Sequence, residues 1–316
     1  MIKYLFIILC LFILGACNST NSALTIKKAL LISIEENQLL NHFETLSSDT
    51  FQGRKVSTKG SLKAQKYIEK QLINMSALPF KGKYRHSFQY KSSFNLVTGS
   101  NIVAFIEGTG TSDKYIVLTA HFDHLGIKGN KIFNGADDNA SGTAALLAIA
   151  EQLTTKALKH NVLILFTDAE EKGLKGSKAF LKENKHFFSQ IKLNINMDML
   201  AGSKSSKNLH YIFHGLDKLL SKESIDKFQG NHLYQEFSII KGFKRNRHEL
   251  NKRTQWLLAS DHGVFHKQGI PFVYYGVGTH KNYHSQNDEF ENTNHQLLIK
   301  STNAIYQQLL FLDKLI

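Results

Sequence analysis

Short apolar runs alternate with helical stretches through most of this chain, and this alternation restricts the possible folds more than any other feature of the sequence. Parallel strands buried on both faces appear as continuous apolar runs, and the helices between such strands cover both faces of the sheet. The predicted strands are residues 101–106, 115–120, 162–167, 193–197 and 270–275, and the predicted helices are residues 142–153, 177–185, 261–268 and 293–314. We therefore predict an α/β fold in which a mainly parallel, mixed sheet is flanked by helices on both faces.

The N-terminal residues have a different character. Lys3 precedes an apolar run at residues 4–14, and small residues then lead to Cys17. This order is typical of a secretion signal, and the run is shorter than the ~20 apolar residues that a transmembrane helix needs. Leu-Gly-Ala-Cys at 14–17 resembles the lipobox of bacterial lipoproteins, so we expect residues 1–16 to be a signal peptide and Cys17 to carry lipid. An ordinary secretory signal or an uncleaved anchor is the alternative.

The predicted signal also sets the domain organisation and the localisation. Residues 17–34 are polar and irregular, which predicts a tether to one folded domain at 35–316. Within that domain, residues 202–260 fit the strand–helix rhythm least well. We expect a lid or insert there, over the active-site end, with a solvated surface excursion as the alternative. The protein would then be lipid-anchored in the bacterial cell envelope, facing the periplasm or the cell exterior.

The charge and the cysteines limit the possible partners. The formal net charge is +13, which could suit nucleic acid. The lysines are dispersed, however, and no aromatic–basic nucleic-acid motif is present. We expect no nucleic-acid partner, a membrane contact through the lipid on Cys17, and a monomer. The two cysteines are Cys10 and Cys17, so the mature chain would contain no disulfide.

Residues of the types that can bind metals or transfer protons come soon after the predicted strands. Ligands bind beyond the carboxyl ends of parallel strands, so these side chains should gather at one edge of the sheet. They are His121 and Asp123 after 115–120, Glu170 and Glu171 after 162–167, Asp198 after 193–197, and His284 after 270–275. A further segment, Asn-Gly-Ala-Asp-Asp-Asn-Ala-Ser-Gly at 134–142, lies at a loop-to-helix junction. Neutral imidazoles and carboxylates suit zinc, and two metals about 3.5–4 Å apart can stabilise both ends of a displacement.

Each of these segments also has an ordinary structural explanation when it is taken alone. The chain holds 15 histidines, most of which need have no role in metal binding. Glu170 and Glu171 could begin a helix, where the dipole favours acidic residues, and Asp137 and Asp138 suit a turn or a helix N-cap. Their shared position beside strand ends favours the metal site.

The same segments appear in the same order in the M28 family of zinc peptidases, which contains bacterial aminopeptidases and is related to glutaminyl cyclases. The chain resembles that family from about Gly53 to its end. The resemblance implies a zinc-peptidase α/β architecture, two Zn²⁺ ions per chain, and a cis peptide between Asp137 and Asp138. It implies these roles: His121 and Asp198 hold one metal, Glu171 and His284 hold the other, Asp137 bridges both, and Glu170 is the catalytic base.

Supporting roles are expected for residues near the ligands. A carboxylate that accepts from the far nitrogen of a ligating histidine fixes its tautomer, and we expect Asp123 to do this for His121 and Asp288 for His284. In Ser-Asp-His at 260–262, His262 is the candidate for steadying the developing oxyanion. A structural role at a helix start is the alternative for His262.

The residues favour hydrolysis of peptide bonds, first by an aminopeptidase that releases N-terminal residues outside the cytoplasm. A glutaminyl cyclase-like acyltransferase, a carboxypeptidase or dipeptidase of the same family, and a non-catalytic surface binding protein are the alternatives. Cyclase-like relatives depart from the Gly-Ala-Asp-Asp-Asn-Ala-Ser-Gly segment and from the complete ligand set, whereas this chain retains both. We therefore expect a zinc-dependent metallopeptidase acting on peptides.

Overall fold

The structure is a computed structural model that describes residues 34–230, 237–243 and 255–316. The predicted signal peptide, Cys17 and nearly all of the tether lie outside the described residues. Within the described ranges, none of the helices combines the length and the hydropathy that a membrane span requires.

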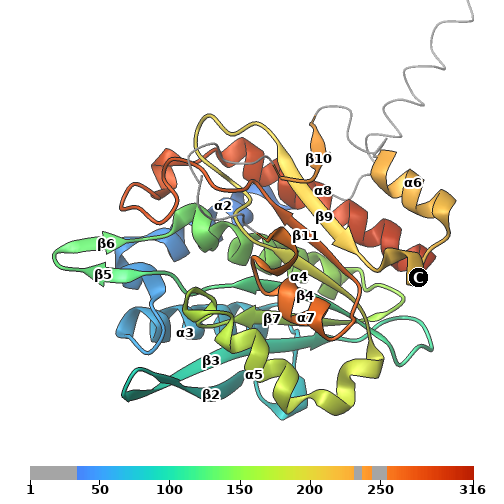
Figure 1. The fold of residues 1–316 in the computed structure, drawn as a ribbon, viewed down its shortest axis with the longest axis horizontal. Helices are drawn as coiled ribbons and strands as arrows, with labels where there is room; N and C mark the ends of the chain where they lie inside the picture. The colour runs from blue at the N-terminus through green and yellow to red at the C-terminus, as the bar shows by residue number, and fades with distance from the viewer. Residues whose placement is uncertain (1–33, 231–236, 244–254) are drawn as a thin grey trace, which may run out of the picture. The chain divides into compact units, whose positions relative to one another are not determined.

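A nine-stranded mixed sheet forms the centre of the domain (Figure 1). Along the sheet, the strands are β1 (Leu78–Pro79), β3 (Asn95–Ile106), β7 (Asn161–Thr167), β4 (Tyr115–His121), β8 (Ile191–Met197), β11 (Phe272–Gly276), β9 (Leu209–His214) and β10 (Ile239–Lys241), and β2 (Arg85–Ser92) pairs with β3. The central strands β7, β4, β8 and β11 are parallel, whereas β3 and β9 join them antiparallel on either side. The carboxyl ends of the four parallel strands therefore meet at one edge of the sheet.

Helices cover both faces of the sheet. On one face α4 (Gly142–Thr155) packs against α2 (Glu36–Ser47), α3 (Lys59–Asn74) and α8 (His295–Leu315), and on the other α5 (Lys175–Glu183) packs against α7 (His262–Lys267). A short helix, α6 (Lys222–Gly230), contacts α8. Most of α4 is buried, including all four of its alanines, as expected for a helix that is apolar on nearly all sides. Val117 and Leu165 of the sheet join Phe180 and Phe265 in the core beneath α5 and α7.

The predicted fold class is confirmed, and so are the predicted strands and helices, with ends that differ by a few residues. Two hairpins were missed because their strands are half-exposed and mostly polar: β2 with the start of β3, and β5 (Gly126–Lys128) with β6 (Lys131–Phe133). Within residues 202–260, positions 231–236 and 244–254 lie outside the described residues, and a lid there stays a prediction. The described strands β9 and β10 of this stretch extend the central sheet, because β9 pairs along its length with β11 and β10 pairs with β9.

Candidate metal centre

Two elements of the parallel sheet deliver the first group of candidate ligands. His121 is the last residue of β4, and Asp198 follows the last residue of β8. The His121 Nε2 atom lies 3.2 Å from Asp198 Oδ1 and 3.4 Å from Asp138 Oδ1. His121 Nδ1 lies 3.2 Å from the backbone carbonyl of Asp123, and a carbonyl can only accept. Nδ1 therefore donates its proton to this carbonyl, and Nε2 faces the two carboxylates and donates to Asp198 Oδ1; with a metal in place, the Nε2 lone pair would bind the ion instead.

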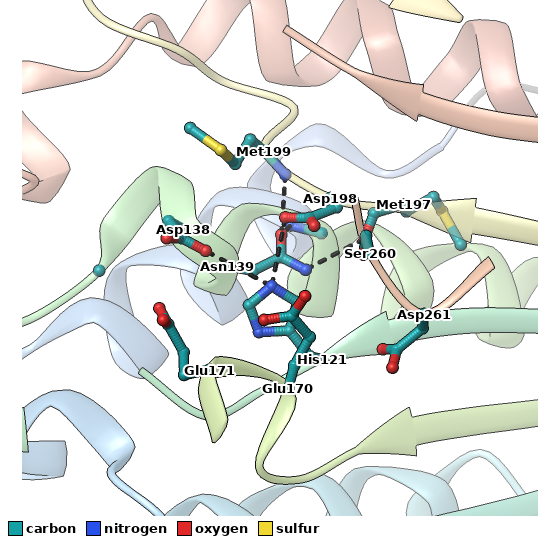
Figure 2. Close-up of polar contacts among 12 residues, drawn as sticks. His121, Asp138, Asn139, Glu170, Glu171, Met197, Asp198, Met199, Ser260 and Asp261 are labelled. Carbon is teal, nitrogen blue, oxygen red and sulfur yellow. Dashed lines mark hydrogen bonds and ion pairs between the residues drawn. The ribbon is translucent and has the colours of Figure 1, made fainter. Parts of the chain in front are cut away.

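A second group lies on the other side of Asp138. His284 Nε2 is 3.2 Å from Asp138 Oδ2 and 3.2 Å from Glu171 Oε1. His124 Nδ1 is 2.9 Å from the same Glu171 oxygen and 3.6 Å from Asp138 Oδ2. Figure 2 shows Asp138 and Glu171 pointing into the space beside His121 and Asp198. We call His121, Asp138 and Asp198 the strand half-site, and His124, Asp138, Glu171 and His284 the loop half-site.

The carboxylate shared by the two half-sites is Asp138, which corrects the prediction that Asp137 bridges them. Asp137 faces away: its Oδ1 accepts from the backbone amides of Ala201 (2.8 Å) and Gly202 (2.7 Å), and its Oδ2 lies 2.8 Å from His280 Nε2. The cis peptide lies one bond later than predicted as well, between Asp138 and Asn139. A sequence of two adjacent aspartates carries no signal that distinguishes them, because only the backbone path decides which one points inward.

The loop that carries Asp138 is fastened to the end of β8 by Asn139. Its side chain donates to the Met197 carbonyl (3.0 Å) and accepts from the amides of Gly142 (2.9 Å) and Met199 (3.0 Å), as Figure 2 shows for the two methionines. A Cβ at Gly142 would lie only 2.3 Å from Asn139 Oδ1. The glycine is therefore required for the close approach, and this packing fixes Asp138 relative to Asp198.

Asp123 and Asp288 support the ligands in ways that differ from the prediction. The Asp123 carboxylate is 3.8 Å from His121 Nδ1, too long for a hydrogen bond, and it accepts instead from the Glu170 amide at 2.9 Å. Asp288 does not orient His284. Its two oxygens accept from the amides of Asp137 (2.9 Å) and Asp138 (3.0 Å), so both carboxylates hold the backbone of ligand-bearing loops.

Arg54 lies fully buried beneath these loops, a role that its position in a short polar stretch did not reveal. The guanidinium donates to four backbone carbonyls: Phe122 at 2.7 Å, Leu46 at 2.6 Å, Asn134 at 2.7 Å and Gly135 at 2.8 Å. Burial lowers the pKa of Arg54 to about 10, opposed by the nearby acidic residues, so the group stays charged at neutral pH. The fork geometry of arginine suits such multiple bonding and joins the loop after β4 to the loop before α4.

Glu170 lies beside the strand half-site, at the start of the turn η4 (Glu170–Lys172). Burial raises the pKa of Glu170 well above its usual range, and the charges of Asp198, Asp261 and Glu171 raise it further, while His121 opposes the shift. A carboxylate whose pKa is raised towards neutrality is a better general base than an ordinary glutamate. Glu171, the next residue, differs: although burial raises its pKa, His124 and His284 lower it below its usual range.

His262 is packed as a structural residue, so we withdraw its predicted catalytic role. It is fully buried at the start of α7, and its ring stacks on Tyr274 with a centroid distance of 4.3 Å. Nε2 donates to the Trp256 carbonyl at 2.8 Å, and Nδ1 lies 3.5 Å from the Asn196 amide nitrogen. Burial lowers the pKa of His262 to about 4, so the ring is neutral, with both nitrogens facing protein groups.

Residues 101–309 match the profile of peptidase family M28. Leucine aminopeptidase 2 of Trichophyton equinum is 25% identical over 253 residues, covering 73% of this chain and 48% of that protein. The alkaline phosphatase isozyme conversion protein of Escherichia coli is 27% identical over 146 residues, 42% of each chain. The chain spans about half the length of the curated relatives it matches.

Two solved structures share the fold. The zinc aminopeptidase BSAP of Bacillus subtilis superposes with a TM-score of 0.69 at 14% identity, covering 88% of this chain and 95% of that chain. Glutaminyl cyclase of Porphyromonas gingivalis superposes with a TM-score of 0.66 at 18% identity, covering 87% and 98%. The profile match covers more than half of the sequence, and the architecture agrees with it. The chain therefore belongs to peptidase family M28.

Proposed function

We propose that the protein is a zinc-dependent metallopeptidase with two metal ions, which releases N-terminal residues from peptides. The observation that carries the proposal is the position of Asp138. One of its oxygens faces His121 and the other faces His284 and Glu171, so a single carboxylate joins two half-sites beside the candidate base, Glu170.

The donor atoms fit zinc. Each half-site offers imidazole nitrogens and carboxylate oxygens, the donors that catalytic zinc sites use. Two groups of these atoms meet the geometric requirement for a shared ion, His121 with Asp138 and Asp198, and His124 with Asp138 and Glu171. Bound zinc would polarise the peptide carbonyl and make water a nucleophile near neutral pH.

Proton transfer from the attacking water to the leaving amine is assigned to a side chain of the protein. We assign Glu170 to accept a proton from the attacking water at its carboxylate and to return it to the leaving amine. Its backbone amide, held by Asp123, fixes the start of the turn. Glu171 faces His124 and His284, so only one of the paired glutamates is free for this step.

A glutaminyl cyclase-like reaction is the second candidate, because a glutaminyl cyclase shares the fold over most of this chain. Hydrolysis is favoured by the complete two-metal donor set. In a cyclase reaction, the N-terminal amine of the substrate would attack the side-chain amide carbon of its own glutamine and displace ammonia, without shortening the peptide.

The localisation forms part of the proposal. We infer from Leu-Gly-Ala-Cys at 14–17 that Cys17 carries lipid and anchors a monomeric enzyme at the bacterial cell envelope, outside the cytoplasm. In cell fractions, wild type should sediment with membranes, and Cys17→Ala should appear in the soluble fraction. Sedimentation of the variant with membranes would contradict lipidation.

Metal dependence and the Glu170 assignment can be tested together. Chelation should abolish peptide hydrolysis and added zinc should restore it. Glu170→Gln should lower turnover by about 10²–10⁴-fold, the usual contribution of general base catalysis, while zinc content stays at two per chain. The matched variant, Glu171→Gln, should lose zinc as well as turnover. If Glu170→Gln loses metal and Glu171→Gln does not, the two roles are exchanged.

A further inference from the structure

His124 is buried at the loop half-site, in contact with two candidate ligands. Its side chain is inaccessible to solvent, and Nδ1 lies 2.9 Å from Glu171 Oε1 and 3.6 Å from Asp138 Oδ2. The first distance is short enough for a hydrogen bond, but the direction is wrong for one. Among the described residues, neither ring nitrogen of His124 has a hydrogen-bond partner, and neither does Glu171 Oε1.

The separations between these atoms are those of ligands around one ion. With bonds of ~2.0–2.1 Å and angles between ~90° and ~110°, two zinc ligands lie about 2.9–3.4 Å apart. The other pairs within the two half-sites lie at 3.2 to 3.6 Å, and the longest of them, between His124 Nδ1 and Asp138 Oδ2, corresponds to an angle of about 120° at the ion. The contact between His124 and Glu171, at 2.9 Å, is at the short end of this range. His124, Asp138 and Glu171 accordingly form one group of donor atoms that is close enough together to share an ion.

The surrounding backbone is built to admit the ring. Gly135 has a left-handed φ of 59°, and a Cβ there would lie 2.3 Å from Cγ of His124. Arg54 holds the carbonyls of Phe122 and Gly135, and so fixes the chain on both sides of the ring. A buried polar group without a hydrogen-bond partner destabilises the folded state. The glycine at 135 and the buried Arg54 nevertheless hold the His124 ring in this position.

We propose that Nδ1 of His124 is a ligand of the metal in the loop half-site, an inference that rests on the proposed function. The loop half-site then offers four protein donors, from His124, Asp138, Glu171 and His284, whereas the strand half-site offers three. A site with four protein donors is closed in the manner of structural zinc sites, and a site with three keeps a position open for catalysis. The loop half-site therefore binds its ion more tightly.

The competing role for His124 is that of an outer partner, which orients Glu171 without touching the metal. The two roles predict different losses of zinc affinity when His124 is replaced. Removal of an outer partner lowers metal affinity by ~10–100-fold, and removal of a direct ligand should lower it further. The full-length protein in detergent should be titrated with zinc against a competing chelator, and wild type compared with His124→Gln. We expect the tighter of two sites to weaken by more than ~100-fold, beyond the outer-partner range.

The matched control is His42→Gln. His42 is also buried, but it lies on α2 and pairs with the Tyr67 hydroxyl at 2.7 Å. Its variant should keep both zinc affinities. Loss of affinity in both variants to the same extent would show a general effect of removing a buried histidine and would overturn the assignment.

A second variant, His124→Cys, tests for a bond between residue 124 and the metal by spectroscopy. This test does not depend on a loss of metal affinity. Nδ1 is the ring nitrogen nearer to Cβ, and a metal–sulfur bond of ~2.3 Å is longer than a metal–nitrogen bond, so a cysteine can reach the same ion. Cobalt-loaded His124→Cys should gain the near-ultraviolet charge-transfer band of a cobalt–thiolate bond, and His42→Cys should not. Two bound cobalt ions without that band in His124→Cys would overturn the proposal.

These results separate the two levels of inference. If wild type holds two zinc ions and His124→Gln holds both with unchanged affinity, the assignment of His124 is wrong and the proposed peptidase is unaffected. If wild type binds zinc at neither half-site, the proposed function itself fails.

Discussion

The two half-sites share Asp138 but are built in different ways. His121 ends a central strand and Asp198 directly follows another, and their side chains are 2% and 10% exposed. Glu171 and His284 come from a turn and a loop, and the His284 side chain is 38% exposed. A half-site whose ligands are all nearly buried therefore lies beside one in which His284 is exposed, although His124 and Glu171 there are 0% and 6% exposed. The hydrophobic pattern of the sheet positions the first, and the second depends on glycines, caps and the buried Arg54.

The largest effect should come from the carboxylate that the half-sites share. Asp138→Asn removes a charge that faces both, so both metals and all peptide hydrolysis should be lost. Asp137→Asn, at the neighbouring position, perturbs the carboxylate contacts with Ser141, Ala201, Gly202 and His280. It should weaken zinc binding by about 10–100-fold, as removal of an outer partner does. The zinc content and the turnover of the two variants show whether Asp138 or Asp137 is the carboxylate that both metals share. An Asp137→Asn protein that lost both metals while Asp138→Asn kept them would restore the original assignment.

The difference in exposure predicts different chemical rescue. His284→Gly and His121→Gly should both lose turnover, because each removes an imidazole from a half-site. Glycine suits the left-handed backbone of His284, where φ is 55°. Added imidazole can reach the position of His284 more easily than that of His121, so turnover should return in His284→Gly only. Equal rescue of both variants would show that the strand half-site is as open as the loop half-site.

Arg54 should matter for stability, because it fastens loops that serve both half-sites. Lysine has a single cationic head and cannot reproduce the arginine fork. Each carbonyl that Arg54→Lys leaves without a donor should cost about 1–3 kcal/mol of unfolding free energy, measured by urea denaturation. The control is Arg85→Lys, at a partly exposed ion pair with Glu69, where a change of about 0–1 kcal/mol is expected. Equal losses would mean that Arg54 has no special role.

The smallest effect is expected from His262, beside the strand half-site. Its pKa is lowered to about 4 by burial, so between pH 6.5 and 4 the unfolded chain binds a proton that the folded protein excludes. Stability from this group is present above pH 6.5 and declines as the pH falls, by up to ~1.4 kcal/mol per pH unit. His262→Gln should flatten that decline in urea unfolding at pH 7 and 5. A loss of turnover of ~10²–10³-fold, typical of an oxyanion donor, would reinstate the catalytic role.

The difference between ligands at strand ends and ligands in loops also explains which site residues could be predicted from the sequence. Apolar strands predict where a sheet ends, and therefore His121 and Asp198 could be placed. Asp138 could not be chosen over Asp137, since the two aspartates are adjacent and only the backbone path decides which side chain faces His121 and His284. His124 follows the same strand as His121 and could have been found by the same signal. Arg54 carries no local pattern, because its role arises from contacts such as that with Asn134, far apart in sequence. Hairpin β2–β3 was missed because its exposed residues lack the apolar pattern of the central strands.

The most direct test of the account is to incubate the zinc-loaded, full-length protein with a mixed peptide pool and to identify the products by mass spectrometry, with Glu170→Gln in parallel. We predict peptides shortened from the N-terminus by wild type and intact peptides with the variant. Loss of ammonia from N-terminal glutamine without shortening, or equal shortening by Glu170→Gln, would contradict a two-metal peptidase in which Glu170 is the base.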